Sequence, residues 1–254
     1  MGKAVTKKDA EQILENALEI GARMLISGAE IRRVEDSIFR ICTAYGSERT
    51  EVFSITYTIV ATISSKNFGI ITQSRRIHGS AFNLQELKYL NNLSRKICRT
   101  LPDMDEVKKD LKEIHSLPTY SNRQGMLIYA LISSAFTLFF GGSLLDAAIS
   151  AVIGVMIKIV EIPLKNMNMN RFLVSCLCSL AAGALAVMAA RTGIGCSSDK
   201  ISIGNVMILI PGLMFTNCIR EMISDNFLSG LTRFGEAVLL SLSIALGFAV
   251  VSWL

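Results

Sequence analysis

The segment from Ile210 to Glu221 contains the residues whose types and spacing best suit the binding of a solute. Pro211 has no amide hydrogen and clashes with the preceding turn, so a helix that runs through it bends or breaks. Gly212 then lets backbone or solute approach closely. In membrane transporters, an interrupted helix of this kind offers backbone amides to a carboxylate. The alternative interpretation is a proline kink that serves only packing.

Three polar side chains follow the proline within three turns. Thr216 and Arg220 share one helical face at i, i+4 spacing, and Asn217 lies beside them. Hydroxyl, amide and guanidinium groups together suit a small hydroxylated or carboxylated solute. These three residues, with Pro211 and Gly212, are therefore the predicted substrate pathway.

Carboxylates in or beside apolar segments are the candidates for proton or ion coupling. Ionisable groups at membrane depth are unfavourable unless they face a partner, a bundle interior or water. Asp146 also fits a position in the outer headgroup layer, and the neighbouring Lys158 fits a side chain that reaches to the interface. The four candidates are Asp146, Glu161, Glu221 and Asp225.

The charge distribution divides the chain into two parts. Residues 1–123 hold 34 charged side chains, whereas residues 124–254 hold only 13 in 131 positions. A soluble domain normally has about a quarter of its residues charged. We therefore predict a soluble head over 1–123 and a membrane domain over 124–254.

Five apolar segments of the membrane domain are each close to the ~20 residues that cross a bilayer. They predict an all-α domain of five transmembrane helices at about 124–141, 144–164, 170–190, 201–222 and 233–254. Five spans place the termini on opposite sides. The side that carries the head has eight basic residues near span ends, against Arg191 and Lys200 on the other side. Because basic loops stay inside, we expect a cytoplasmic N-terminus and an outer C-terminus in the cell membrane.

The head shows both structural periods and is predicted to be α+β. Apolar residues at helical spacing predict a helix from about 7 to 26, and Ser27 with Glu30 matches a capping box that starts a second helix. Alternation of apolar and polar residues predicts a strand within Thr50–Ser65, where a break would give two, and another at Gly69–Ile77.

Several functions are not indicated. The chain has no GxxxxGK[ST] or GxGxxG arrangement, so ATP is not the expected energy source and no cofactor is predicted. With His78 and His115 as the two histidines and no CxxC pair, a metal site is not expected either. No basic run is interleaved with aromatic residues, so nucleic acid is not an expected partner. The basic excess fits a head close to the anionic lipid bilayer.

Two ordered motifs about 180 residues apart resemble those of the threonine/serine exporter family. Residues 28–36 are similar to its glycine-alanine-glutamate-x-x-arginine-valine-glutamate signature, which here includes Gly28, Glu30, Arg33 and Glu35. Residues 211–221 and 229–237 resemble its carboxy-terminal signature. The likeness covers nearly the whole chain. It implies the short form of the family, a head plus five helices that works with a separate small four-helix membrane subunit, and export of threonine, serine or a dicarboxylate such as succinate.

The leading hypothesis is thus a gradient-driven exporter subunit for small polar metabolites, and not an enzyme. A second hypothesis makes the head an enzyme such as a hydrolase, with Glu30, Glu35 and Asp36 as acid/base groups, but no Ser-His-Asp or Cys-His constellation accompanies them. A third makes the head a membrane-tethered sensor or assembly module that gates the pore. The solute, the coupling ion and assembly into a homo-oligomer are left open by the sequence.

Overall fold

The computed structural model describes residues 6–79, 82–118, 120–192 and 197–252. They form two compact units, which are described separately. The first comprises Met1–Pro118 and Asn217–Arg233, so a short segment from late in the chain clusters with the N-terminal residues. The second comprises Thr119–Thr216 and Phe234–Leu254.

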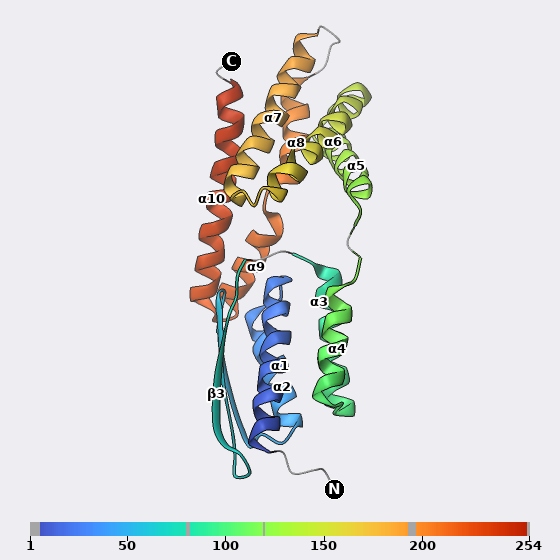
Figure 1. Cartoon of the computed structure of the whole chain (residues 1–254). Coiled ribbons are helices and arrows are strands. Elements are labelled where there is room, and N and C mark those ends of the chain that lie inside the picture. The colour runs from blue at the N-terminus through green and yellow to red at the C-terminus, as the bar shows by residue number, and fades with distance from the viewer. Residues whose placement is uncertain (1–5, 80–81, 119, 193–196, 253–254) are drawn as a thin grey trace. The chain divides into compact units, whose positions relative to one another are not determined.

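The first unit packs helices against one face of a small sheet (Figure 1). Strands β1 (Arg49–Ile55), β2 (Thr58–Ser65) and β3 (Gly69–Arg76) form an antiparallel sheet in the order β1-β2-β3. Helix α1 (Lys7–Ile26) contacts β2, β3 and the helices α2 (Ile31–Ala44), α3 (Leu84–Thr100) and α4 (Met104–His115). It is therefore the central element of this unit.

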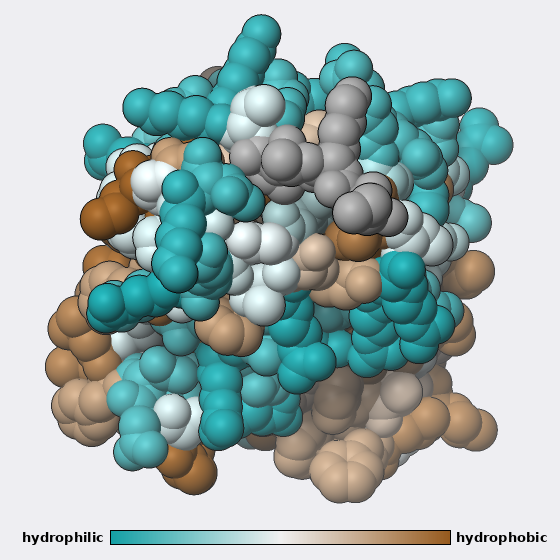
Figure 2. All heavy atoms as spheres, turned by 90° about the horizontal axis from the view of Figure 1, so that it is seen from below, coloured by the Kyte–Doolittle hydropathy of each residue, from teal (hydrophilic) through white to brown (hydrophobic). Residues whose placement is uncertain are grey.

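The core of the first unit explains why these segments form these elements. Helix α1 begins with a capping box between Thr6 and Asp9 and buries one apolar face, as its periodicity predicts. Strand β2 alternates buried and partly buried residues along its whole length, as expected for a sheet covered on one face. The fully buried side chains include Leu14, Leu18, Met24, Ile38, Ile59, Ile63 and Leu90. In Figure 2, hydrophilic residues cover much of the face that is visible.

The predicted helix from 7 to 26 is confirmed, but the predicted capping box at the start of α2 is wrong. Ser27 is the C-terminal cap of α1, and its buried hydroxyl has no hydrogen-bond partner among the residues that the structure describes. Gly28 follows with φ of +96°, which turns the chain. Glu30 is the N-cap of α2 and makes no side-chain capping bond. The first amides of α2 therefore need another acceptor.

The second unit is a helical bundle. Its helices are α5 (Asn122–Phe139), α6 (Leu144–Asn166), α7 (Arg171–Arg191), α8 (Ser198–Leu209) and the greater part of α10 (Phe227–Ser252). Helices α5, α6, α7 and α8 contact one another, and the start of α9 (Gly212–Ile223) also belongs to this unit. Many large apolar side chains on these helices are exposed, as lipid contact requires.

The predicted fold, an α+β cytoplasmic head followed by five transmembrane helices, is wrong. The described residues form ten helices and one three-stranded sheet, and three helices are long and apolar enough to span a membrane: α6, α7 and α10. A fourth span exists only if α8 and α9, which are bent by 52° at Pro211, count as one. Helix α5 does not qualify because it is 18 residues long and begins with polar residues at positions 122–124.

Candidate functional site

A buried carboxylate in α9 caps the start of α2 within the first unit. Oε1 of Glu221 accepts a hydrogen bond of 2.9 Å from the backbone amide of Ile31, although the two residues are 190 positions apart. Glu221 is buried, with only 1% of its surface exposed. A negative charge is favourable at a helix N-terminus, where amides lack intrahelical partners. Glu221 thus supplies the acceptor that the local sequence does not.

Two arginines surround this cap with positive charge. Arg220 donates a hydrogen bond of 2.6 Å from Nη1 to Oε1 of Glu30, which is a second link between α9 and the start of α2. Arg233, only 7% exposed, interacts electrostatically with Glu221. We call Glu30, Ile31, Arg220, Glu221 and Arg233 the α2–α9 contact. Its two acidic and two basic side chains balance, as burial of charge requires.

Glycines allow the close approach of the segments that form this contact. A Cβ atom on Gly230 would lie 2.6 Å from Cγ of Met222 and 2.9 Å from the carbonyl oxygen of Cys218. A Cβ on Gly28 would lie 2.5 Å from the ring of Phe82. Larger residues would force these segments apart.

The other charged residues of the N-terminal motif have different surroundings. Glu35 lies one turn further along α2 and accepts hydrogen bonds from the backbone amide and the hydroxyl of Ser54, at 2.8 and 3.0 Å. This pair joins α2 to β1. Arg33 is exposed and lines a groove between α2 and α3. Residues of the motif therefore lie at three different surfaces of α2, which face α9, β1 and the groove beside α3.

The predicted pathway residues lie at and after the break between α8 and α9. Ile210 ends α8 in an extended conformation, and Gly212 starts α9 with open space where a Cβ would stand. The hydroxyl of Thr216 donates to the carbonyl of Gly212 at 3.1 Å, so its oxygen can still accept from a ligand. Asn217 is partly buried one residue later. Arg220 points to Glu30, as described above.

The remaining coupling candidates differ in how fully they are engaged. Asp146 completes the capping box of α6 with the N-cap Ser143 and accepts from the amide of Ser197 at 2.8 Å, so its carboxylate is fully engaged in hydrogen bonds. Asp225 is exposed in the turn between α9 and α10, with φ of +66°.

Glu161 is the coupling candidate with the most partners. It accepts from Lys158 at 2.8 Å, from the hydroxyl of Tyr129 at 2.9 Å and from Lys165 at 2.5 Å. Lys158 also lies over the Tyr129 ring, 4.8 Å from its centroid. Lys158, Glu161, Lys165 and Tyr129 thus form one cluster, which the sequence did not predict.

A buried polar network in the second unit escaped the sequence analysis. Ser133 donates to Oδ1 of Asn205 at 2.9 Å, and Nδ2 of Asn205 donates to the hydroxyl of Ser150 at 2.9 Å. Thr137 donates to Ser150 at 2.7 Å. All four side chains have zero exposure and join α5, α6 and α8. The i, i+4 spacing of Ser133 and Thr137 was the available signal, because polar side chains in apolar helices usually face other helices.

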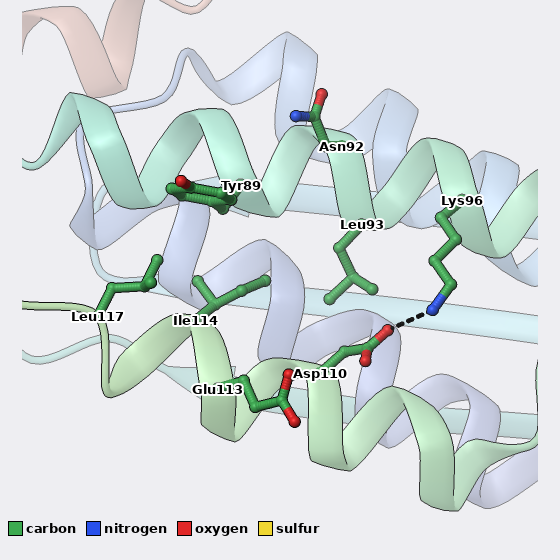
Figure 3. A pocket seen from close by; sticks show the side chains of 8 residues that line it. All are labelled: Tyr89, Asn92, Leu93, Lys96, Asp110, Glu113, Ile114 and Leu117. Carbon is green, nitrogen blue, oxygen red and sulfur yellow. Dashed lines mark hydrogen bonds and ion pairs between the residues drawn. The ribbon is translucent and has the colours of Figure 1, made fainter.

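A second pocket lies in the first unit, away from the α2–α9 contact. This pocket of about 370 Å³ lies between α3 and α4, where Figure 3 shows Lys96 reaching Asp110. Lys96 pairs with both Asp110 and Glu106, at 2.8 and 2.9 Å, so the positive charge of Lys96 in this pocket is compensated. Among the described residues, no group of three or more His, Cys, Asp and Glu side chains could hold a metal ion.

Comparison with known proteins gives consistent likenesses. The model of the threonine/serine exporter family, ThrE, matches residues 15–254. A Klebsiella aerogenes protein named "Probable succinate transporter subunit YjjP" is 21% identical over 250 residues, which cover 97% of this chain and 96% of that protein. The protein of the same name from Escherichia coli (strain K12) is 22% identical over 231 residues, covering 91% and 90% respectively. No solved structure matches the chain.

Proposed function

The chain belongs to the threonine/serine exporter family, and from that premise we propose that it is one subunit of an exporter for a small carboxylate-bearing metabolite. It is a multi-pass membrane protein of a family that moves small metabolites. Family membership favours transport over catalysis. The contacts of Glu30 with Arg220 and of Glu35 with Ser54 also favour structural roles for the carboxylates that an enzyme would need.

The solute that we propose is threonine, serine or a dicarboxylate such as succinate. The family description supports the hydroxy-amino acids, and the names of the two relatives support succinate. All three solutes carry a carboxylate, so one binding principle serves them. The experiment below separates them.

The break at Pro211 is the observation that carries the proposal. It interrupts an apolar helical pair with a 52° bend and starts α9 at an exposed glycine with open space beside it. The amides of Gly212 and Met214 donate to the carbonyls of Ile210 and Pro211, so the attraction for a carboxylate here comes chiefly from the dipole of α9 and the open space beside Gly212. We assign Pro211, Gly212, Thr216, Asn217 and Arg220 to the solute pathway on this basis.

Gradient-driven flux needs a group that changes its charge. Asp146, Glu161, Glu221 and Asp225 are the proposed carriers of a proton or another ion, and their surroundings rank them. Glu161 and Glu221 are buried or nearly so, and each has cationic neighbours that could compensate a change of charge. Asp146 is held as a helix cap, so we place it last.

The orientation that we propose has the N-terminal unit in the cytoplasm and the C-terminus outside the cell membrane. Residues 217–233 belong to the same unit as residues 1–118, and α10 starts there and continues as a candidate span. A single crossing by α10 would put the two termini on opposite sides, which supports the proposed orientation. The basic residues near the N-terminal unit favour the cytoplasmic side for it.

The partner that we propose is a small four-helix membrane subunit of the same family. The relatives are named as transporter subunits, which supports a second chain. The N-terminal motif, with Gly28, Glu30, Arg33 and Glu35, would then gate transport through the α2–α9 contact, because that contact joins α2 to the helix that carries the pathway residues.

Efflux measurements on variants test the pathway. Cells that express the chain with its four-helix partner would be preloaded with labelled succinate, threonine or serine. We expect Pro211→Ala, Asn217→Ala and Arg220→Ala to reduce efflux at equal membrane levels. Pro163→Ala is the matched control, because Pro163 lies inside the unbroken helix α6. Wild-type efflux in all three pathway variants, or equal loss in the control, would remove the broken helix from the pathway.

A further inference from the structure

A groove between α2 and α3 in the first unit has an excess of positive charge. Its volume is about 460 Å³, within the range of ~300–1,000 Å³ that small-molecule sites occupy. Arg33 and Arg40 lie on its α2 side, one i, i+7 interval apart, and Arg95 and Arg99 lie on its α3 side at i, i+4. Helical spacing thus aims two pairs of arginines into one groove.

Most of this charge is uncompensated. Asp36 is the one acidic residue in the lining, and it pairs with Arg40 at 2.8 Å. Within the described ranges, the guanidinium groups of Arg33, Arg95 and Arg99 make no hydrogen bond or ion pair. The α3–α4 pocket of Figure 3 differs in this respect, because Lys96 there has two carboxylate partners. Three arginines in one groove repel one another unless an anion joins them.

The neutral polar side chains of the groove are already engaged. The amide of Asn91 donates to the carbonyl of Leu87 at 2.7 Å, and the hydroxyls of Ser37 and Ser94 donate to carbonyls of their own helices. The arginine N–H groups are therefore the donors that remain for a ligand. Guanidinium groups bind carboxylate and phosphate oxygens through paired, charge-assisted hydrogen bonds.

We propose that the α2–α3 groove binds a compact oxyanion with about three negative charges, of the polyphosphate or tricarboxylate class. The charge matches the three unpaired arginines, and the volume fits an anion with several phosphate or carboxylate groups rather than a single phosphate or sulfate ion. The site is separate from the transported solute's pathway and needs no part of the proposed function. Arg33 lies in the first turn of α2, which also carries Ile31, so a bound anion changes the electrostatic potential at the α2–α9 contact.

The test is a binding titration of the full chain in phosphatidylcholine nanodiscs with inorganic tripolyphosphate, and a second one with citrate. We expect saturable binding that weakens as salt increases. The double variant Arg95→Gln/Arg99→Gln should lose about tenfold or more in affinity, because each pair with an oxyanion contributes on the order of a tenfold factor. Arg32→Gln is the control, since Arg32 is an exposed arginine of α2 outside the groove lining.

The possible results of these titrations lead to different conclusions. Equal affinity in wild type and double variant, an equal loss in Arg32→Gln, or no saturable binding of either anion would overturn the proposal. Folding of the variants is checked by their unchanged thermal midpoint without anion. Repeating the titration in nanodiscs that contain phosphatidylglycerol identifies the source of the anion. Competition by this lipid in wild type would make a lipid headgroup the occupant, and no competition would make it a soluble metabolite.

Discussion

The carboxylate of Glu221 lies 2.9 Å from the backbone nitrogen of Ile31 and caps a helix that begins 190 residues earlier in the chain. This hydrogen bond joins residues 28–36 to residues 217–233, which belong to the same unit. Within the first unit, a change at the start of α2 should therefore affect residues 217–233, and a change in residues 217–233 should affect the start of α2.

Loss of the Glu221 carboxylate should destabilise this unit. Glu221→Ala leaves the Ile31 amide without its acceptor and buries Arg233 without its negative neighbour, so we expect a loss of about 1–3 kcal/mol and a lower melting temperature. Glu221→Gln keeps an acceptor oxygen and should lose less. The measurement is the temperature at which the purified chain in detergent loses its monodisperse gel-filtration peak. Equal midpoints for wild type and Glu221→Ala would show that the cap does not stabilise the fold.

The Glu30–Arg220 pair should contribute little to stability. Its side chains are 38% and 54% exposed, and exposed ion pairs are worth about 0–1 kcal/mol. We therefore expect the melting temperatures of Glu30→Ala and Arg220→Ala to stay near that of wild type. A reduced efflux in Arg220→Ala then reports on transport and not on unfolding. A large fall in the melting temperature of either variant would contradict this separation.

The buried polar network requires small residues around it. A Cβ on Gly204 would lie 2.0 Å from the hydroxyl oxygen of Thr137, so Gly204→Ala should destabilise the bundle by about 1–3 kcal/mol. Gly235→Ala is the matched control, because no atom lies within 4 Å of its added Cβ. Thermal unfolding in detergent compares the two. A control variant that loses as much as Gly204→Ala would mean that glycine substitution itself, and not the close contact, is responsible.

Glu19 should make stability depend on pH. Burial alone would raise its pKa, but hydrogen bonds and ion pairs with Arg23 and Arg75 outweigh burial and lower it. Because the pKa of Glu19 is lower in the folded chain than in the unfolded chain, its ionised carboxylate stabilises the fold at pH values above the ordinary pKa of a glutamate. This contribution is lost as the pH falls through the lowered pKa.

The comparison of wild type with Glu19→Gln measures this contribution. The difference in melting temperature should be largest near neutral pH and should shrink in acid. Glu15→Gln, an exposed position on the same helix, should show no such trend. A difference that is constant between neutral and acid pH would assign the effect of the variant to packing.

Local patterns in the sequence predicted local structure well. The periodicity of α1 and the alternation along β2 each depend on one buried face, which neighbouring residues reveal directly. The start of α2 could not be predicted, because its acceptor is Glu221 and not Ser27. Sequence spacing contains no information on which distant segment will supply a cap.

The predicted number of membrane spans was wrong for a related reason. The apolar length of residues 124–141 and 201–222 predicted that each would be a membrane span. The polar start of α5 and the break at Pro211 mean that neither segment forms one long apolar helix. The importance of Pro211 itself was predictable, since proline interrupts helices wherever it occurs in their interior. Ser133, Thr137, Ser150 and Asn205 were overlooked because each is unremarkable until three helices bring them together.

The proposed function makes this chain one of two subunits that export a carboxylate-bearing metabolite. The most direct test preloads cells that lack their own exporters with labelled succinate, threonine or serine. They would express this chain alone, the four-helix partner alone, or both. We predict faster efflux of one of these solutes when both proteins are present. Unchanged efflux of all three, with both proteins shown to be in the membrane, would contradict the claim.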